Sequence, residues 1–136
     1  LATTGDLAKV VHRVLGPKRG RIDPATRTFQ ALRIAVNREL DQLASLVEAI
    51  PGLLVPGGVA AIISFHSLED RIVKQFIRRH SQPPPTRRGL PPLTQAPLRL
   101  CAVGGAQQAG DVELARNPRA RSAVLRVAEK LAGDAA

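Results

Sequence analysis

The sequence predicts an α/β fold, specifically the second half of a doubly wound sheet with helices packed against it. The first observation is residues 54–79, where a Pro-Gly-Gly turn, a continuous apolar run and an amphipathic stretch follow one another. That order is typical of one β-loop-α unit. A long helical pattern precedes the unit, and two strand-like segments follow it, at 98–103 and 123–128. The glycine-rich phosphate loop that marks the first half of such sheets is absent from the sequence.

A short amphipathic helix is predicted at the start of the chain. Thr3 and Asp6 have the spacing of a capping box. Five apolar residues then recur at helical intervals, namely Leu7, Val10, Val11, Val14 and Leu15. Gly16-Pro17 ends the pattern. The basic loop at 18–21 is either a solvated surface or a phosphate contact, and the residues leave both interpretations open.

One long helix is predicted next, with Asp23 as N-cap and Pro24 as its first residue. Its apolar stripe covers six turns and consists of Phe29, Leu32, Val36, Leu40, Leu43, Val47 and Ile50. A polar row lies beside that stripe, formed by Gln30, Arg33, Asn37 and Asp41. Such a row is found where a helix borders a cleft and also at an ordinary surface boundary. The first three side chains can bind a base or a phosphate, whereas we expect Asp41 to pair with a neighbour.

Residues 59–65 predict a strand buried on both faces, because they form a continuous apolar run rich in β-branched residues. Ser64, His66 and Ser67 lie at its carboxyl end, the edge where ligands bind in open α/β sheets. Ser67 is expected to cap the following helix, with Asp70 in the reciprocal position. His66 is not needed for that cap. Its imidazole can donate to a substrate, act as a base or simply hydrogen-bond the loop.

The remaining chain predicts an extended connection and an antiparallel strand pair. Residues 81–97 contain six prolines, which exclude helix and central strand. The segments 98–103 and 123–128 are expected to pair and to close one side of the sheet. Before the second of them, Arg116, Arg119 and Arg121 form a basic turn, for which we favour phosphate contact or the pinning of a neighbouring loop.

Charge and composition limit the partners and the kinds of site that we expect for this protein. The formal net charge is +9, with a net of +1 in residues 1–70 and +8 in residues 71–136. Such asymmetry favours an acidic partner, nucleic acid first, although a coding bias towards arginine produces similar numbers. Cys101 is the only cysteine, which excludes a disulfide framework, and we expect it in the core. No apolar run reaches membrane-span length and the histidines lack metal-ligand spacing, so we expect a cytoplasmic protein without metal.

Three blocks of the sequence resemble the RsmH/MraW family, and they appear in the family's order. The blocks are PATRTFQALRIAVNREL, VPGGVAAIISFHSLEDRIVKQFIRR and NPRARSAVLRVAEK. The resemblance covers nearly all of residues 1–131. Members of this family are bacterial enzymes that use S-adenosyl-L-methionine to methylate N4 of a cytidine in the decoding region of 16S ribosomal RNA.

The resemblance implies the C-terminal half of a class I (Rossmann-like) S-adenosylmethionine-dependent methyltransferase fold. Residues 1–22 would be the end of a helical insertion that recognises the substrate, and residues 23–136 the last part of the catalytic domain. The main cofactor contacts of the family would lie upstream, so none is assigned here, and we expect this chain alone to be inactive. Family members usually have the sequence His-Pro-Ala-Thr-Arg, so a histidine stands where this chain has Asp23 before Pro24. We expect the carboxylate to keep the helix cap.

The resemblance also implies roles for individual residues. Ser64, His66 and Ser67 would line the cytidine pocket, and the small ribosomal subunit with its 16S RNA would be the partner. The RNA-binding residues would be Arg27, Gln30, Arg33, Asn37, Arg119 and Arg121. The alternative to an enzyme is a basic binding module that binds RNA or the ribosome without catalysis. An upstream reading frame that encodes a Gly-Gly-His loop would favour the enzyme.

Overall fold

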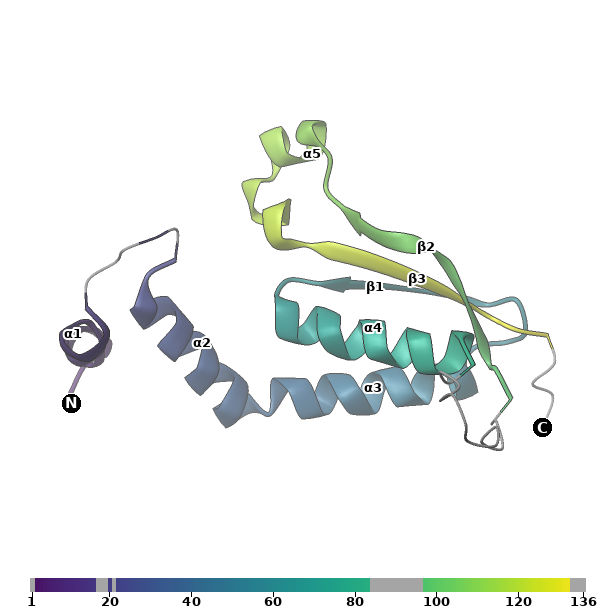
Figure 1. Cartoon of the computed structure of the whole chain (residues 1–136), viewed down its shortest axis with the longest axis horizontal. Coiled ribbons are helices and arrows are strands. Elements are labelled where there is room, and N and C mark those ends of the chain that lie inside the picture. The colour runs from purple at the N-terminus through teal and green to yellow at the C-terminus, as the bar shows by residue number, and fades with distance from the viewer. Residues whose placement is uncertain (1, 17–19, 21, 84–96, 133–136) are drawn as a thin grey trace, which may run out of the picture. The chain divides into compact units, whose positions relative to one another are not determined.

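The computed structural model describes residues 2–16, 20, 22–83 and 97–132 (Figure 1). The chain divides into two compact units, Leu1–Asp41 and Gln42–Ala136, and each is described by itself below. Most of the predicted proline-rich connection lies outside the described residues, as do Arg87 and Arg88 within it. Most of the basic loop at 18–21 also lies outside them.

The first unit contains helix α1, Thr4–Leu15, and helix α2, Pro24–Asn37. The predicted capping box of α1 is confirmed. The backbone N–H of Asp6 donates to Thr3 Oγ1 at 3.2 Å, and the N–H of Thr3 donates to Asp6 Oδ2 at 3.1 Å. The helix ends at Gly16, whose φ of +82° favours glycine. Val11 is the buried residue of α1.

Asp23 performs two tasks in this unit. Its Oδ1 accepts a hydrogen bond from the backbone N–H of Ala25 at 2.8 Å, which caps α2 as predicted. The same oxygen lies 2.7 Å from Nε2 of His12 on α1. The carboxylate at this position therefore caps one helix and ties the other helix to it.

The prediction of one long helix is wrong, because the chain breaks at Arg38. Helix α2 ends at Asn37, and helix α3 runs from Glu39 to Leu53. Arg38 has φ +52° and ψ +37°, a left-handed conformation that costs a non-glycine residue roughly 1–2 kcal/mol. The Glu39 carboxylate, directly after this residue, accepts hydrogen bonds from both Arg33 and Asn37.

The break also divides the predicted apolar stripe. Val47 on α3 is 1% exposed, whereas Val36 on α2 is 79% exposed and Leu32 is 46% exposed. The expected pairing of Asp41 is confirmed, because its Oδ2 accepts from Arg38 Nε at 3.0 Å.

The second unit contains a three-stranded sheet with the order β1-β3-β2 (Figure 1). Its strands are β1, Val59–Ser64, β2, Leu100–Gln108, and β3, Val124–Lys130. Both neighbours of β3 run antiparallel to it, which confirms the predicted antiparallel pair. Strands β1 and β2 consequently run parallel to each other. A register shift between Val103 and Gln107 includes Gly104, whose φ is +67°.

Helices connect these strands. Helix α4, Ser67–Ser81, links β1 to β2, as the β-loop-α pattern predicted. Between β2 and β3 the chain forms a short helix α5, Asp111–Arg116, and a 3-10 turn η1, Pro118–Ser122. The sequence had indicated only a polar stretch and a basic turn there.

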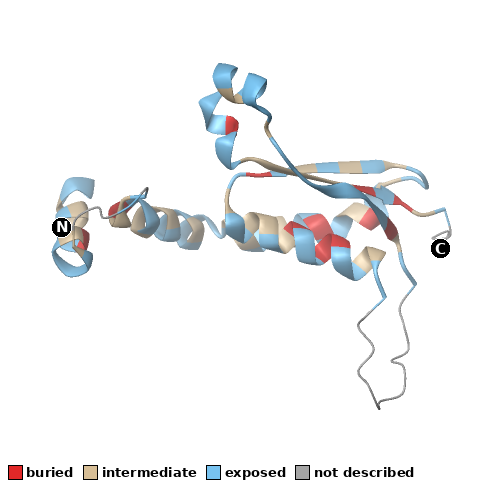
Figure 2. Ribbon diagram, turned by 45° about the horizontal axis from the view of Figure 1, so that its top comes forward, coloured by how far each residue is buried: buried red, intermediate tan, exposed pale blue. Residues whose placement is uncertain are grey.

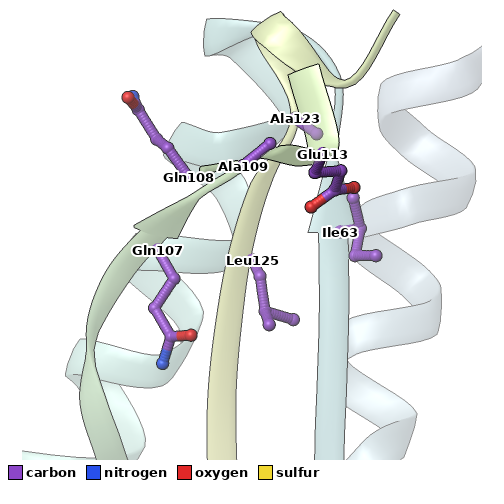
Figure 3. A pocket seen from close by; sticks show the side chains of 7 residues that line it. All are labelled: Ile63, Gln107, Gln108, Ala109, Glu113, Ala123 and Leu125. Carbon is purple, nitrogen blue, oxygen red and sulfur yellow. The ribbon is translucent and has the colours of Figure 1, made fainter. Parts of the chain in front are cut away.

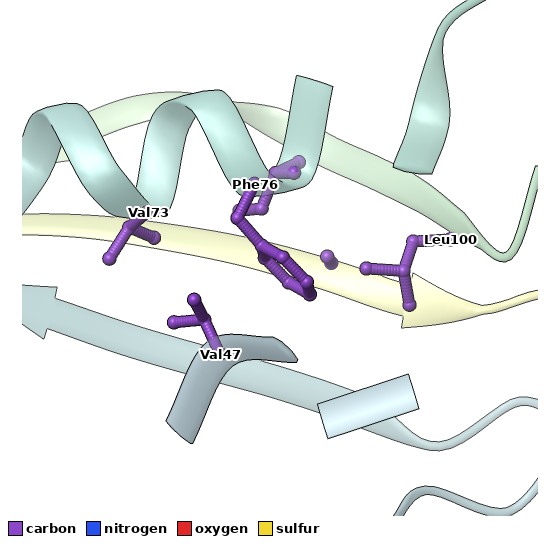
Figure 4. Packing of buried hydrophobic residues seen from close by; sticks show 6 residues of the cluster. Val47, Val73, Phe76 and Leu100 are labelled. Atoms are coloured by element: carbon purple, nitrogen blue, oxygen red, sulfur yellow. The ribbon is translucent and has the colours of Figure 1, made fainter. Parts of the chain in front are cut away.

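The core lies between α4, α3 and one face of the sheet (Figure 4). Its buried members are Val47, Val73, Phe76, Ile77, Leu100 and Ala128. This arrangement confirms the apolar face predicted for α4. Figure 2 shows buried residues gathered where the helices meet the sheet, while much of the strand surface is exposed.

Two predictions of burial are wrong for the same reason. Strand β1 was expected to be buried on both faces, but its exposure alternates, and Val59 and Ile63 are 56% and 57% exposed. Cys101 was expected in the core, but its thiol is exposed. These side chains lie on the face of the sheet turned away from α4, so the core between the helices and the sheet does not bury them.

The turn before β1 is held by a buried lysine. Gly57 has the positive φ, +77°, that the Pro-Gly-Gly pattern predicted. Its N–H donates to the carbonyl of Lys130 at 2.9 Å, and the N–H of Lys130 donates to the carbonyl of Gly58 at 2.8 Å. Lys130 is 8% exposed, and its Nζ donates to the carbonyl of Leu54 at 2.9 Å. The ammonium group thus satisfies a carbonyl just beyond the end of α3.

Val73→Ala is expected to lower the free energy of unfolding of the chain by about 2 kcal/mol, because it removes buried methyl groups and leaves a cavity. The matched control is Val36→Ala on α2, expected to change it by less than about 0.5 kcal/mol because Val36 is exposed. Urea unfolding of both variants measures the difference. Equal losses would contradict the burial of Val73 in the core and the exposure of Val36.

Candidate functional site

The candidate site is the turn that joins the carboxyl end of β1 to the start of α4. The N-cap of α4 is His66 and not Ser67, contrary to the prediction. Its Nδ1 accepts a hydrogen bond from the backbone N–H of Glu69 at 3.3 Å. The Glu69 carboxylate accepts in return from the N–H groups of Phe65 and His66, at 2.8 and 3.2 Å. An imidazole nitrogen has a lone pair, so it fills the place of the usual hydroxyl.

Asp70 does not complete the cap either, because it binds β3. Its two carboxylate oxygens accept from Nε and Nη2 of Arg126 at 2.7 and 3.0 Å. Both side chains are about four-fifths buried, with 21% and 18% exposed. The hydrogen bonds from Arg126 hold the pKa of Asp70 below its usual range, although burial opposes the shift. The same bonds raise the pKa of Arg126. The first turn of α4 is therefore attached to the central strand.

The ring of His66 is enclosed by this arrangement. Its side chain is 13% exposed, and Nε2 is buried without a hydrogen-bond partner among the described residues. Nε2 lies 3.3 Å from Glu69 Oε1, but the two atoms are not aligned as a hydrogen bond. Since Nδ1 accepts from Glu69, the neutral ring carries its proton on Nε2.

The three predicted residues of the strand end differ in accessibility. Ser64 is 3% exposed and pairs with Val124 in the sheet, whereas Ser67 is exposed. Phe65 lies between them in sequence and is 58% exposed. An exposed aromatic ring next to a polar turn offers a surface on which a base can stack.

Sequence reasoning missed the importance of Glu69, Arg126 and Phe65. A signal for Glu69 was present, because it stands three residues after His66, the spacing of a capping box. Arg126 carried no such signal, since it lies 56 residues from Asp70 along the chain.

The predicted RNA-binding residues of α2 belong to the first unit. Arg27 is exposed and Gln30 is half-buried. Arg33 lies 2.9 Å from Glu39 Oε1, and Asn37 Nδ2 donates to the same oxygen at 3.3 Å. The structure thus brings Arg33 and Asn37 together on one carboxylate.

Arg119 and Arg121 lie in η1 and are exposed. Asn117 caps this turn, because its Oδ1 accepts from the N–H of Arg119 at 3.2 Å. The turn ends two residues before Val124, the sheet partner of Ser64. Within the second unit, the register therefore places η1 at the same edge of the sheet as the candidate site.

A pocket of about 190 Å³ lies at this edge, on the sheet face turned away from α4 (Figure 3). Ile63 and Leu125 are sheet partners in its wall, and Gln107 is the partner of Leu125 on the other side. The remaining lining residues are Gln108, Ala109, Glu113 and Ala123. Because the pocket is smaller than the roughly 300 Å³ of typical ligand sites, we assign no ligand to it.

The described residues form neither a membrane-spanning helix nor a metal-binding cluster. Within the part of the chain that the structure describes, no helix is both long and apolar enough to cross a membrane. The same residues contain no group of three or more His, Cys, Asp or Glu side chains placed to hold a metal ion.

Asp70→Asn is expected to lower the free energy of unfolding by about 2 kcal/mol at neutral pH, because it breaks the charged hydrogen bonds to Arg126. The folded-state pKa of Asp70 lies below its unfolded value of about 3.9. The wild-type stabilisation is therefore present above about pH 4 and is lost as the pH falls through the folded-state pKa. Urea unfolding across this range should show the two proteins converging at low pH.

The control for this prediction is Asp41→Asn, because the Arg38–Asp41 pair is largely exposed. Its effect is expected to stay below about 0.5 kcal/mol. A constant difference between wild type and Asp70→Asn at all pH values would show that the ion pair is not the source of the stabilisation.

Comparison with known proteins identifies the family. Residues 1–131 match the MraW methylase family. Ribosomal RNA small subunit methyltransferase H of Stenotrophomonas maltophilia (strain K279a) is 52% identical over 132 residues, which cover 97% of this chain and 41% of the relative. The protein of the same name in Sorangium cellulosum (strain So ce56) is 54% identical over 98% of this chain and 38% of its own length. The chain thus spans about two fifths of the relatives it matches, and it belongs to the MraW methylase family.

Proposed function

We propose that this chain is part of an enzyme that transfers a methyl group from S-adenosyl-L-methionine to N4 of a cytidine in the decoding region of 16S ribosomal RNA. The match to the MraW methylase family over residues 1–131 carries the proposal. Relatives that are 52–54% identical are named ribosomal RNA small subunit methyltransferase H. We infer that the reaction takes place in the cytoplasm, where ribosomal subunits mature.

The strand arrangement supports a class I methyltransferase domain. Strands β1 and β2 run parallel and are linked by α4, and β3 lies antiparallel between them. The resemblance implies that the final strand pair is the antiparallel edge of the Rossmann-like catalytic sheet. We infer that residues 23–136 complete that sheet and that residues 1–22 end a helical insertion that recognises the substrate.

The chemistry of the target explains what the strand end must supply. The lone pair of the cytosine amino group is delocalised into the ring, so the nitrogen is a weak nucleophile. The site has to hold the base out of its stack, align the amino group and accept a hydrogen bond or proton from it. We assign the cytidine pocket to Ser64, His66 and Ser67. Ser67 and Phe65 are both exposed and lie two positions apart in this turn.

We assign RNA backbone contacts to two groups of residues. Arg119 and Arg121 are exposed at the same sheet edge as the strand end, and guanidinium groups in such positions bind phosphates. On α2, the contacts would come from Arg27, Gln30, Arg33 and Asn37. The net charge of +8 in residues 71–136 supports this partner.

The described residues do not by themselves form a binding site for S-adenosyl-L-methionine. Class I sheets bind the nucleoside with a glycine-rich turn that leads from a strand into a helix. Among the described residues, the turn after β1 contains no glycine, and Gly57 and Gly58 stand before that strand. We therefore assign the cofactor contacts to the part of the relatives' length that this chain does not span.

Methyl transfer from labelled S-adenosyl-L-methionine to unmethylated small ribosomal subunits tests the proposal. The assay compares this chain with an extended protein that includes the upstream coding sequence. We expect label on N4 of a cytidine with the extended protein and none with the chain alone. If both proteins bind the subunits and neither transfers label, the enzyme is excluded and a non-catalytic RNA-binding module remains.

Replacing Arg119 and Arg121 by alanine is expected to weaken binding of the extended protein to small subunits and to make binding less dependent on salt. The negative slope of log K against log salt concentration should become shallower by about 2, since each lost phosphate contact reduces its magnitude by about 1. Lysine at both positions keeps the charge and should keep most of the slope. An unchanged slope in the alanine variant would exclude these arginines from the interface.

A further inference from the structure

We infer that Glu69 is a positioning residue that holds His66 in the tautomer protonated on Nε2. His66 then serves the proposed methyl transfer as a hydrogen-bond donor and not as the base that takes the proton from the amino group. The first statement rests on contacts within this chain. The second rests on the proposed function.

Glu69 acts on the turn from two sides. Its carboxylate Oε2 accepts the N–H groups of both Phe65 and His66, so the two residues after the strand cannot rotate without losing a charged acceptor. Its backbone N–H donates to Nδ1 of His66. One residue therefore fixes the backbone that carries the imidazole and occupies one of its two nitrogens.

The occupied nitrogen determines the tautomer. A neutral imidazole has one donor and one acceptor nitrogen, and Nδ1 is the acceptor because it receives an N–H. The proton is consequently on Nε2, which lies 3.3 Å from Glu69 Oε1. The negative carboxylate so close to Nε2 favours a proton there over a lone pair.

The remaining donor has no acceptor among the described residues. Nε2 is buried and makes no hydrogen bond within them, and a buried N–H without an acceptor is unfavourable. Cytosine offers acceptors at O2 and N3, next to the amino group that is to be methylated. Because Nε2 is buried in the described turn, the N–H can donate to these atoms only when the turn opens to admit the base. A base for the amino proton would need a lone pair on the same nitrogen. The proton acceptor must therefore be another group.

The tautomer can be measured in the chain without RNA or cofactor. Nitrogen-15 NMR of the chain with labelled histidine, at about pH 8 where an imidazole is neutral, distinguishes protonated from unprotonated ring nitrogens. His66→Asn assigns the signals, and asparagine keeps the N-cap. We expect Nδ1 of His66 to be unprotonated and Nε2 to be protonated. The opposite assignment in the wild-type chain would overturn the inference.

Two substitutions and one control test the role of Glu69. Glu69→Ala keeps the backbone N–H that donates to Nδ1 but removes the carboxylate that holds the turn and lies 3.3 Å from Nε2, so we expect a mixture of His66 tautomers. Glu69→Gln keeps an acceptor oxygen for the N–H groups of Phe65 and His66, and it serves as the variant in which the turn stays folded. The control is Glu48→Ala, because Glu48 lies 3.6 Å from Nε2 of His80. It should move the His80 signals and leave those of His66 in place. Unchanged His66 signals in Glu69→Ala would refute the positioning role of the carboxylate, whereas little change is expected in Glu69→Gln.

Kinetics of the extended protein test the role of the donor. Glu69→Ala should lower kcat on the order of tenfold, with KM for the subunits little changed, because the donor is misplaced. His66→Asn should lower the rate at every pH and keep the acidic limb of the pH–rate profile. Loss of that limb would show that His66 is the base. Absence of methyl transfer from wild-type protein that has the expected tautomer would refute the proposed function and leave the role of Glu69 intact.

Discussion

Two adjacent carboxylates fix the start of α4, and the candidate site depends on both of them. Glu69 binds the backbone of the turn that leaves β1, and Asp70 binds Arg126 on β3. The first contact sets the conformation of Phe65 and His66, and the second sets the distance of the helix from the central strand. A polar turn at the end of a strand is otherwise free to adopt several conformations, so these contacts give the site a defined geometry.

The site combines enclosed groups with accessible ones. Ser64 and His66 are held inside the turn, while Phe65 and Ser67 face outward. This division suits a site that receives a base from outside, because fixed polar groups can read the edge of the base while an exposed ring covers its face. Much of the opposite face of β1 is exposed, which agrees with a chain that spans about two fifths of its relatives.

Local patterns in the sequence predicted much of the fold. The capping box at Thr3, the cap at Asp23 and the unit of β1 and α4 all depend on residues within a few positions of one another. The break at Arg38 was missed because a single carboxylate, Glu39, gathers two side chains of the preceding helix. The exposure of Cys101 and the pairing of Asp70 with Arg126 depend on tertiary structure that periodicity does not specify.

We propose that the target cytidine meets the turn between β1 and α4. The most direct measurement places a photoreactive amino acid at Ser67 of the extended protein and maps its crosslink on unmethylated small subunits. We expect a crosslink at the methylated cytidine or the nucleotide next to it. A crosslink confined to other parts of the 16S RNA, in a protein that still methylates the subunit, would contradict it.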